Sequence, residues 1–173
     1  GHWITQRVNI PDGLQCVLFI PDSEMPTSEA RNILPDMISR EDAVFNLTRT
    51  AMLVNCFATS QFAPMRIAME DRLHQQYRES MFPFAPIIKG ALEAGAHGSY
   101  LSGAGPTVLA ITGGVGIADV GSDTMSQFLA EQVSEAMVAA AAKNGVTGTA
   151  HIATPSFYGI QSNGYDAAGN ELW

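Results

Sequence analysis

Apolar residues along the chain form several short runs that predict strands. Residues 15–20 (QCVLFI) are an apolar, β-prone run that ends at the turn pair Pro21-Asp22. Apolar side chains occupy consecutive positions in this run, so both of its faces are expected to be buried, as in a strand at the centre of a sheet. The other predicted strands are residues 98–101, 107–112 and 148–153.

Start and stop signals predict five helices between these strands. Thr27 is a good N-cap for the first helix, and Pro35 ends it because proline disfavours α geometry at the preceding residue. Pro64 opens the third helix, and Gly95 supplies the left-handed stop of the fourth. The predicted helices are residues 27–34, 40–59, 64–77, 82–94 and 123–143.

The second of these helices has the clearest pattern. Ser39 is followed three residues later by Asp42, which is the spacing of a capping box with Asp in place of the preferred Glu or Gln. Apolar residues then recur at helical spacing and predict an amphipathic helix that ends near Thr59. These apolar positions are Val44, Leu47, Ala51, Met52, Val54 and Ala58.

The order of the elements indicates the fold class. A strand is followed by several helices, two strands, a helix and a last strand, without the regular alternation of a parallel α/β fold and without an internal repeat. We therefore predict a single α+β domain whose mostly antiparallel sheet is covered by helices on one side. Residues 162–173 are a polar, turn-rich tail, in which residues 168–170 are predicted to turn a small hairpin.

Composition agrees with a folded domain and excludes some partners. The chain is 46% hydrophobic and 15% charged, so it can bury a sizeable core. Its net charge of −8, with no run of Lys or Arg, argues against a nucleic-acid partner and against attraction to a membrane surface. The acidity is interpreted as a contribution to solubility.

The two cysteines indicate a reducing compartment. Cys16 and Cys56 lie far apart in apolar stretches, so they are expected to be buried free thiols, as suits the cytoplasm. No Cys/His cluster exists in the sequence, and no metal site is predicted. No apolar run in it is long enough to span a bilayer.

The most distinctive candidate for chemistry is the glycine-rich turn at residues 101–107 (LSGAGPT). Two glycines spaced by one residue let the backbone turn sharply and leave N–H groups open to an anion or another loop. A tight turn between two strands explains the pattern equally well. The segment is neither a Walker A loop, since no Gly-Lys-Ser/Thr follows, nor a dinucleotide fingerprint, since a strand follows it.

Two further segments contain arginines that are suited to carboxylate binding. Arg31 lies four residues after Thr27, on the same face of the first helix, and could bind a carboxylate through two nitrogens. Asp71 and Arg78 lie two turns apart on one face if residues 70–78 form a single helix, so Asp71 could orient Arg78 or meet a substrate ammonium. The alternative for each segment is a solvated surface. His74 has no partner for a metal site or a triad.

These segments together resemble the homoserine kinases of the GHMP kinase superfamily. Residues 25–35 (MPTSEARNILP), 68–83 (AMEDRLHQQYRESMFP) and 95–111 (GAHGSYLSGAGPTVLAI) follow the order and spacing of that family. The last segment looks like the third GHMP kinase motif, which by itself indicates the superfamily. The Thr-x-x-x-Arg before Leu-Pro and the Asp before Tyr-Arg point to the homoserine branch.

The resemblance implies the fold of a GHMP kinase C-terminal domain, which is a ferredoxin-like plait. It divides the chain into a strand segment remaining from an N-terminal half (1–22), the C-terminal domain (23–161) and a tail (162–173). The Gly-Leu-Gly-Ser-Ser phosphate loop of the family is not found in this sequence, and the acidic Mg²⁺ ligand is expected upstream with it. The chain alone is therefore expected to lack kinase activity.

The resemblance also implies an activity and residue roles. Members transfer the γ-phosphoryl group of ATP to the side-chain hydroxyl of L-homoserine, with Mg²⁺, in threonine biosynthesis. Arg31 and Arg78 would bind the carboxylate end of L-homoserine, and Thr27 would lie beside its hydroxyl. Gln76 stands where the family commonly has proline, which is expected to change local helix geometry. The residues of the turn that would pack beside the phosphate region are Ser102, Gly103, Ala104, Gly105 and Thr107.

Two other functions stay open at this point. The chain could be a stand-alone, non-catalytic domain that binds an amino acid or a partner, or part of a GHMP kinase for another small alcohol. If half of a two-domain kinase is absent, apolar surface is exposed, so self-association as a symmetric homodimer is expected. The partners expected are L-homoserine and ATP, with no nucleic acid and no membrane.

Overall fold

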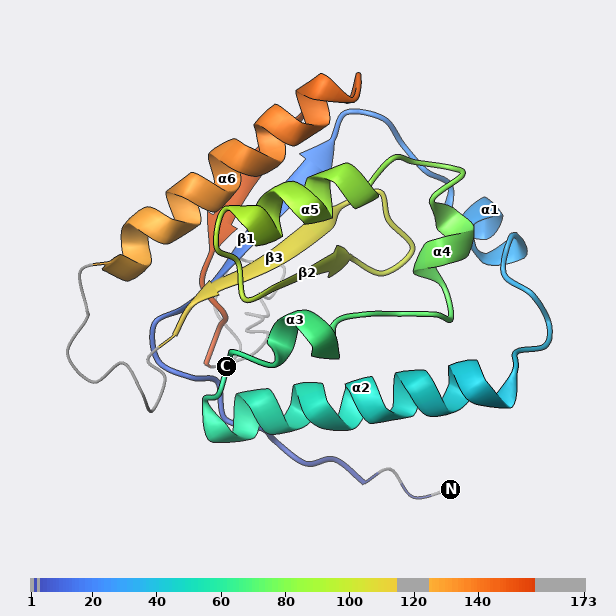
Figure 1. The fold of residues 1–173 in the computed structure, drawn as a ribbon, viewed down its shortest axis with the longest axis horizontal. Coiled ribbons are helices and arrows are strands. Elements are labelled where there is room, and N and C mark those ends of the chain that lie inside the picture. The colour runs from blue at the N-terminus through green and yellow to red at the C-terminus, as the bar shows by residue number, and fades with distance from the viewer. Residues whose placement is uncertain (1, 3, 115–124, 158–173) are drawn as a thin grey trace, which may run out of the picture.

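The computed structural model of the chain describes residues 2, 4–114 and 125–157 (Figure 1). In these parts of the chain, four strands form one sheet in the order β2-β3-β1-β4, and every pair of neighbours is antiparallel. With the helices between them, this is the order of a ferredoxin-like plait, as predicted. The strands are β1 (Leu14–Pro21), β2 (Gly98–Leu101), β3 (Val108–Gly113) and β4 (Gly148–Ala153).

The first strand lies inside the sheet, between β3 and β4. Val17 stands opposite Ala110 on one neighbour and Ile152 on the other. The side chains of Val17 and Phe19 are fully buried, and their neighbour Leu18 on the other face is half-buried. The prediction of a central strand from its consecutive apolar residues is confirmed.

Helices pack against both faces of the sheet, so the prediction that they cover one side is wrong. On one face, Val17, Phe19 and Ala110 pack with buried residues of α5 and α6. On the other face, Leu14 and Ile111 pack with residues of α2 and α3 (Figure 1). The helices are α1 (Thr27–Asn32), α2 (Arg40–Thr59), α3 (Met65–Ala68), α4 (Gln75–Arg78), α5 (Ala85–Glu93) and α6 (Met125–Lys143).

The start of α2 follows its sequence signal closely. The Ser39 hydroxyl accepts a hydrogen bond from the backbone N–H of Asp42 at 3.0 Å and donates one to the Asp42 carboxylate at 2.8 Å. This pairing satisfies one of the backbone donors that a helix start leaves open. The cap and both ends of the predicted helix are confirmed.

Most of the apolar residues predicted for α2 face away from the sheet. Met52 packs inward, beside Leu53, Cys56 and Phe57. The others form a row on the opposite side of the helix and are exposed to solvent. This outer stripe of α2 consists of Val44, Leu47, Ala51, Val54 and Ala58.

Two predicted helix starts differ from the structure. Pro26 occupies the N-cap position of α1 and Thr27 is the first helical residue, so Thr27 is not the N-cap, and its helix has no side-chain cap. The fixed φ of proline carries the chain into the helix one residue early. The fourth predicted helix begins at Ala85 instead of residue 82, with Pro86 in its first turn.

The prediction of one helix over residues 64–77 is wrong. The segment forms two short helices, α3 and α4, with residues 69–74 between them outside helical structure. The Asp71 carboxylate accepts hydrogen bonds from the backbone N–H groups of Leu73, His74 and Gln75. These local bonds replace the bonds of a continuous helix, so Asp71 and Arg78 do not share a helix face.

The remaining expectations concern the cysteines, membrane-spanning helices and the C-terminal part of the chain. Cys56 is buried and Cys16 is half-buried, and both are free thiols. No helix in the described residues is long and apolar enough to cross a membrane. The predictions for the tail at 162–173 and for residues 123–124 of the last helix fall outside the described residues.

Candidate functional site

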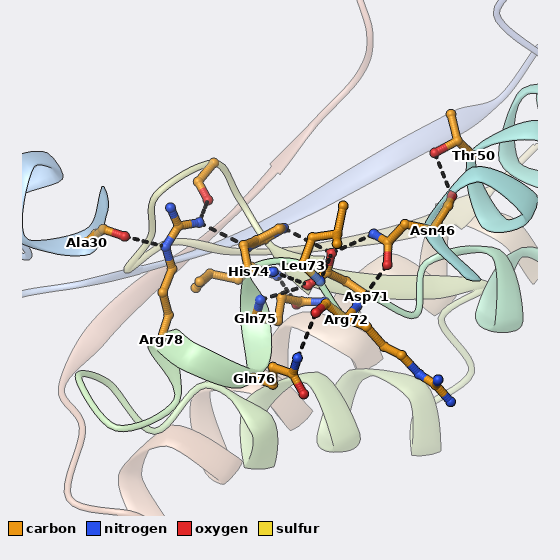
Figure 2. Close-up of polar contacts among 12 residues, drawn as sticks. Ala30, Asn46, Thr50, Asp71, Arg72, Leu73, His74, Gln75, Gln76 and Arg78 are labelled. Atoms are coloured by element: carbon orange, nitrogen blue, oxygen red, sulfur yellow. Dashed lines mark hydrogen bonds and ion pairs between the residues drawn. The ribbon is translucent and has the colours of Figure 1, made fainter. Parts of the chain in front are cut away.

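The guanidinium group of Arg78 joins the three segments that carry the candidate residues (Figure 2). Its Nε donates to the carbonyl oxygen of Ala30 in α1 at 2.9 Å. Its Nη1 bonds to His74 Nδ1 at 2.9 Å and to the carbonyl oxygen of Gly103, in the glycine-rich turn, at 3.0 Å. Residues far apart in the sequence therefore meet at one side chain.

Arg78 is buried, and the part of the chain that the structure describes offers it no acidic partner. The residue is 6% exposed, yet in the described part of the chain no ion pair includes it. A buried charge is costly unless an opposite charge compensates it. The guanidinium is thus suited to bind a ligand that brings a carboxylate or another anion.

Helix α1, whose Ala30 contacts this group, also contains the two other candidate residues of the first segment. Arg31 follows Ala30, the residue whose carbonyl oxygen accepts from Arg78, and Thr27 lies one turn earlier on α1. Both side chains are exposed to solvent. The spacing predicted from the sequence is retained, although Thr27 begins the helix instead of capping it.

The glycine-rich turn closes on itself and packs against the segment before α1. The N–H of Ser102 donates to the carbonyl of Thr107 at 2.8 Å, and the N–H of Gly105 donates to the carbonyl of Ser102 at 3.0 Å. Gly105 has φ of +90°, and a Cβ added there would lie 2.5 Å from Met25 Cε. The segment is therefore a tight turn between β2 and β3 that also needs glycine for close packing.

Asp71 organises the segment that leads to Arg78. Each of its oxygens accepts two hydrogen bonds, including one from the side-chain amide of Asn46 at 2.7 Å (Figure 2). Burial raises the pKa of Asp71, but the bonds from Gln75, His74 and Asn46 outweigh burial and hold the pKa below its usual value. The carboxylate fixes the backbone entering α4 and reaches Arg78 through His74.

His74 and Asn46 are the site residues that sequence reasoning missed. Asn46 also accepts from the backbone N–H of Arg72 at 2.9 Å and so connects α2 to the segment before α4. Its position on the polar side of α2 carried no separate signal in the sequence. Both residues line a cavity of about 140 Å³ beside Gln75 and Tyr100.

Gln75 links the same segment to the sheet. Its side-chain oxygen accepts from the backbone N–H of Leu101, at the end of β2, at 2.8 Å. Since Leu101 leads directly into the glycine-rich turn, α4 is tied to the turn both here and through Arg78. The site is held at three points by hydrogen bonds to backbone groups.

Comparison with known proteins identifies the family. A family model described as "GHMP kinases C terminal" matches residues 53–144, which is more than half of the chain. The chain belongs to the GHMP kinase family.

Two curated relatives and one solved structure that this GHMP kinase domain resembles are all named homoserine kinases. The homoserine kinase of Desulfitobacterium hafniense is 39% identical over 150 residues, which are 86% of this chain and 46% of that protein. The homoserine kinase of Halothermothrix orenii is 45% identical over 105 residues, 60% of this chain and 34% of that protein. The crystal structure of homoserine kinase from Cytophaga hutchinsonii matches with a TM-score of 0.74 and 26% identity, over 86% of this chain and 44% of that one. The chain spans about half the length of the curated relatives it matches.

The residues of this GHMP kinase domain fit only part of the chemistry that the family name implies. In the described residues, no group of three or more His, Cys, Asp or Glu side chains could hold a metal ion, so no Mg²⁺ site is assigned here. Two N–H groups of the glycine-rich turn are used within the turn itself. The chemistry that these residues can supply is the binding and orientation of an anionic ligand by Arg78.

Proposed function

We propose that the protein containing this domain is a homoserine kinase, which transfers the γ-phosphoryl group of ATP to the side-chain hydroxyl of L-homoserine with Mg²⁺. The observation that carries the proposal is the buried Arg78 guanidinium, which has no acidic partner in the described residues. The names of the relatives support the same substrate. Such an enzyme would serve threonine biosynthesis in the cytoplasm.

In this proposal the chain binds and orients the acceptor. Arg78 and Arg31 bind the carboxylate of L-homoserine, Thr27 lies beside its hydroxyl, and Asp71 fixes the backbone that carries Arg78. The turn at Ser102–Thr107 packs beside the phosphate region. Phosphoryl transfer depends mostly on positioning and charge stabilisation, so a fixed guanidinium contributes by holding the acceptor in place.

The 173 residues alone would then not phosphorylate homoserine. ATP supplies the phosphoryl group when it is bound. Neither a Walker A loop nor a Gly-Leu-Gly-Ser-Ser phosphate loop, which would bind ATP, occurs in this sequence. We expect the ATP and Mg²⁺ sites to be formed mainly by further residues of a longer protein.

A coupled assay of ADP release by the complete protein tests the proposal. L-homoserine is expected to be a better acceptor than L-serine, mevalonate or galactose. Arg78→Met and Arg31→Met should each raise the KM for L-homoserine about 10- to 100-fold, the loss expected for a hydrogen bond to a charged group. Arg40→Met, at the exposed start of α2, serves as the control.

Two results of this assay would contradict the proposal. Turnover of another alcohol in preference to L-homoserine would identify a different GHMP kinase. Binding of an amino acid without any ATP turnover by the complete protein would identify a non-catalytic domain.

We also propose that the chain forms a homodimer through the outer stripe of α2. In an antiparallel pair of α2 helices centred on Ala51, Leu47 would meet Val54 of the second copy, and Val44 would meet Ala58. The positions beside the stripe are uncharged, being Thr48, Thr50 and Asn55. No like charges would therefore face each other, despite the net charge of −8.

A further inference from the structure

We propose that His74 is a positioning residue, whose neutral imidazole fixes the Arg78 guanidinium in the orientation that binds the carboxylate of the acceptor. The carboxylate half of this inference rests on the proposed homoserine kinase function. The contact between His74 and Arg78 is seen in the structure and does not depend on the proposed function.

The hydrogen bond between these two side chains defines the protonation state of His74. Arginine nitrogens can only donate, so the bond of 2.9 Å from Arg78 Nη1 requires a lone pair on His74 Nδ1. The imidazole is then neutral with its hydrogen on Nε2. That nitrogen lies 3.9 Å from the Asp71 carboxylate, which favours a hydrogen on this side of the ring.

The bond restricts how Arg78 can turn. Ala30 accepts from Nε, while His74 and Gly103 both bond to Nη1, so three fixed groups hold the guanidinium plane through two of its three nitrogens. Among the described residues, Nη2 donates to no protein group and carries no dashed line in Figure 2. This nitrogen is the one left to bind a carboxylate, and its direction is set by the bonds that the other two nitrogens make.

His74 is itself held in place. Its backbone N–H donates to Asp71 at 2.8 Å, and Asp71 is in turn bonded to Asn46 of α2. The chain of contacts thus runs from α2 through Asp71 and His74 to Arg78. These contacts connect the Arg78 side chain to α2 through two intermediate residues.

The surroundings of His74 favour the neutral ring. Burial lowers the pKa of His74 most, the Asp71 carboxylate opposes that effect, and the Arg78 guanidinium lowers the pKa further. Arg49 and Glu70 pair with each other at 2.8 Å across the neighbouring cavity, where Tyr100 of β2 also lies. Protonation of Nδ1 at acid pH would remove the acceptor and place an imidazolium against the guanidinium.

Nitrogen-15 NMR of the histidines in the complete protein tests the contact without any substrate. We expect His74 to show the tautomer with hydrogen on Nε2, with His2, His97 and His151 as internal references. Arg78→Met should raise the pKa of His74, because it removes a nearby positive charge. A hydrogen on Nδ1, or a pKa of His74 that does not respond to Arg78→Met, would overturn the inference.

Steady-state kinetics of two variants test the positioning role. His74→Ala should raise the KM for L-homoserine about tenfold, with kcat and the KM for ATP within about twofold of the original values. His74→Gln, whose amide oxygen can accept from Arg78, should recover most of that loss. The KM should rise in the original protein as the pH falls through the lowered pKa of His74, and it should stay flat over that range in His74→Gln.

Melting temperatures of both variants separate a role in binding from a loss of folding. If His74→Ala and His74→Gln are equally stable but raise the KM equally, or if neither raises it, the positioning role is wrong. If the original protein does not use L-homoserine at all, the proposed function fails, and so does the carboxylate half of this inference. Failure of the NMR test with an active homoserine kinase would overturn the inference and leave the function standing.

Discussion

Asp71 shows at the scale of a single residue how one carboxylate can organise the backbone around a site. It accepts hydrogen bonds from the side-chain amide of Asn46 and from three successive backbone N–H groups. Because those bonds hold the pKa of Asp71 below its usual value, the ionised form stabilises the folded protein. This contribution is present above the pKa of the unfolded state and is lost as the pH falls through the lower pKa of the folded state.

Asp71→Asn should therefore destabilise the protein in a pH-dependent way. The asparagine amide would place donors against the N–H groups that Asp71 now accepts from, and a cost of about 2 kcal/mol is expected near pH 7. The difference should shrink at a second, acidic pH below the lowered pKa of Asp71, where its carboxylate is protonated. Urea unfolding at both pH values measures this, with the exposed Asp36→Asn as the control. An equal cost at both pH values would contradict the electrostatic explanation.

The sequence indicated some of these residues and could not indicate others. Arg31, Arg78 and the glycine-rich turn stood out through residue type, spacing and resemblance to a family. Asn46 did not, because its role depends on a contact with Asp71, which lies 25 positions away in the sequence. A role that arises only from tertiary contact leaves no local pattern to find.

At the scale of elements, the strands were easier to predict than the short helices. Strands β1 and β3 follow apolar runs, and most of their side chains are buried or half-buried in the sheet. The helix predicted over residues 64–77 failed because Asp71 satisfies backbone donors that a helix would otherwise use. The pattern of apolar positions does not indicate that a side chain competes with the helix for these backbone N–H groups.

The turn between β2 and β3 gives a prediction that separates its two glycines. Gly105→Ala should cost about 2 to 4 kcal/mol, because alanine at φ of +90° is strained and its Cβ would collide with Met25. Gly103→Ala is the matched control: its φ is +58°, nothing lies within 4 Å of an added Cβ, and a cost of about 1 kcal/mol is expected. Thermal unfolding of both variants measures the difference. Equal costs would show that the contact with Met25 adds nothing.

At the scale of the whole molecule, the sequence could not say which side of α2 faces the sheet. The helix carries apolar residues on two sides: Met52 and Cys56 pack inward, whereas Leu47 is 69% exposed. Either set fits the period of a helix, so periodicity alone cannot choose between them. An exposed row of this kind on one helix is the usual mark of an interaction surface.

Leu47→Glu should abolish self-association of the chain if the outer stripe of α2 joins two copies. In the antiparallel pair, the new carboxylate would lie against Val54 of the second copy, and burying an unpaired charge there is costly. Light scattering should give the original chain twice its mass of 18.5 kDa and the variant about that mass. Val138→Glu, an equivalent change on the exposed side of α6, should leave the dimer intact. If the original chain is a monomer, the stripe does not join two copies. If the complete protein is a monomer, further residues of the same protein pack against the stripe instead.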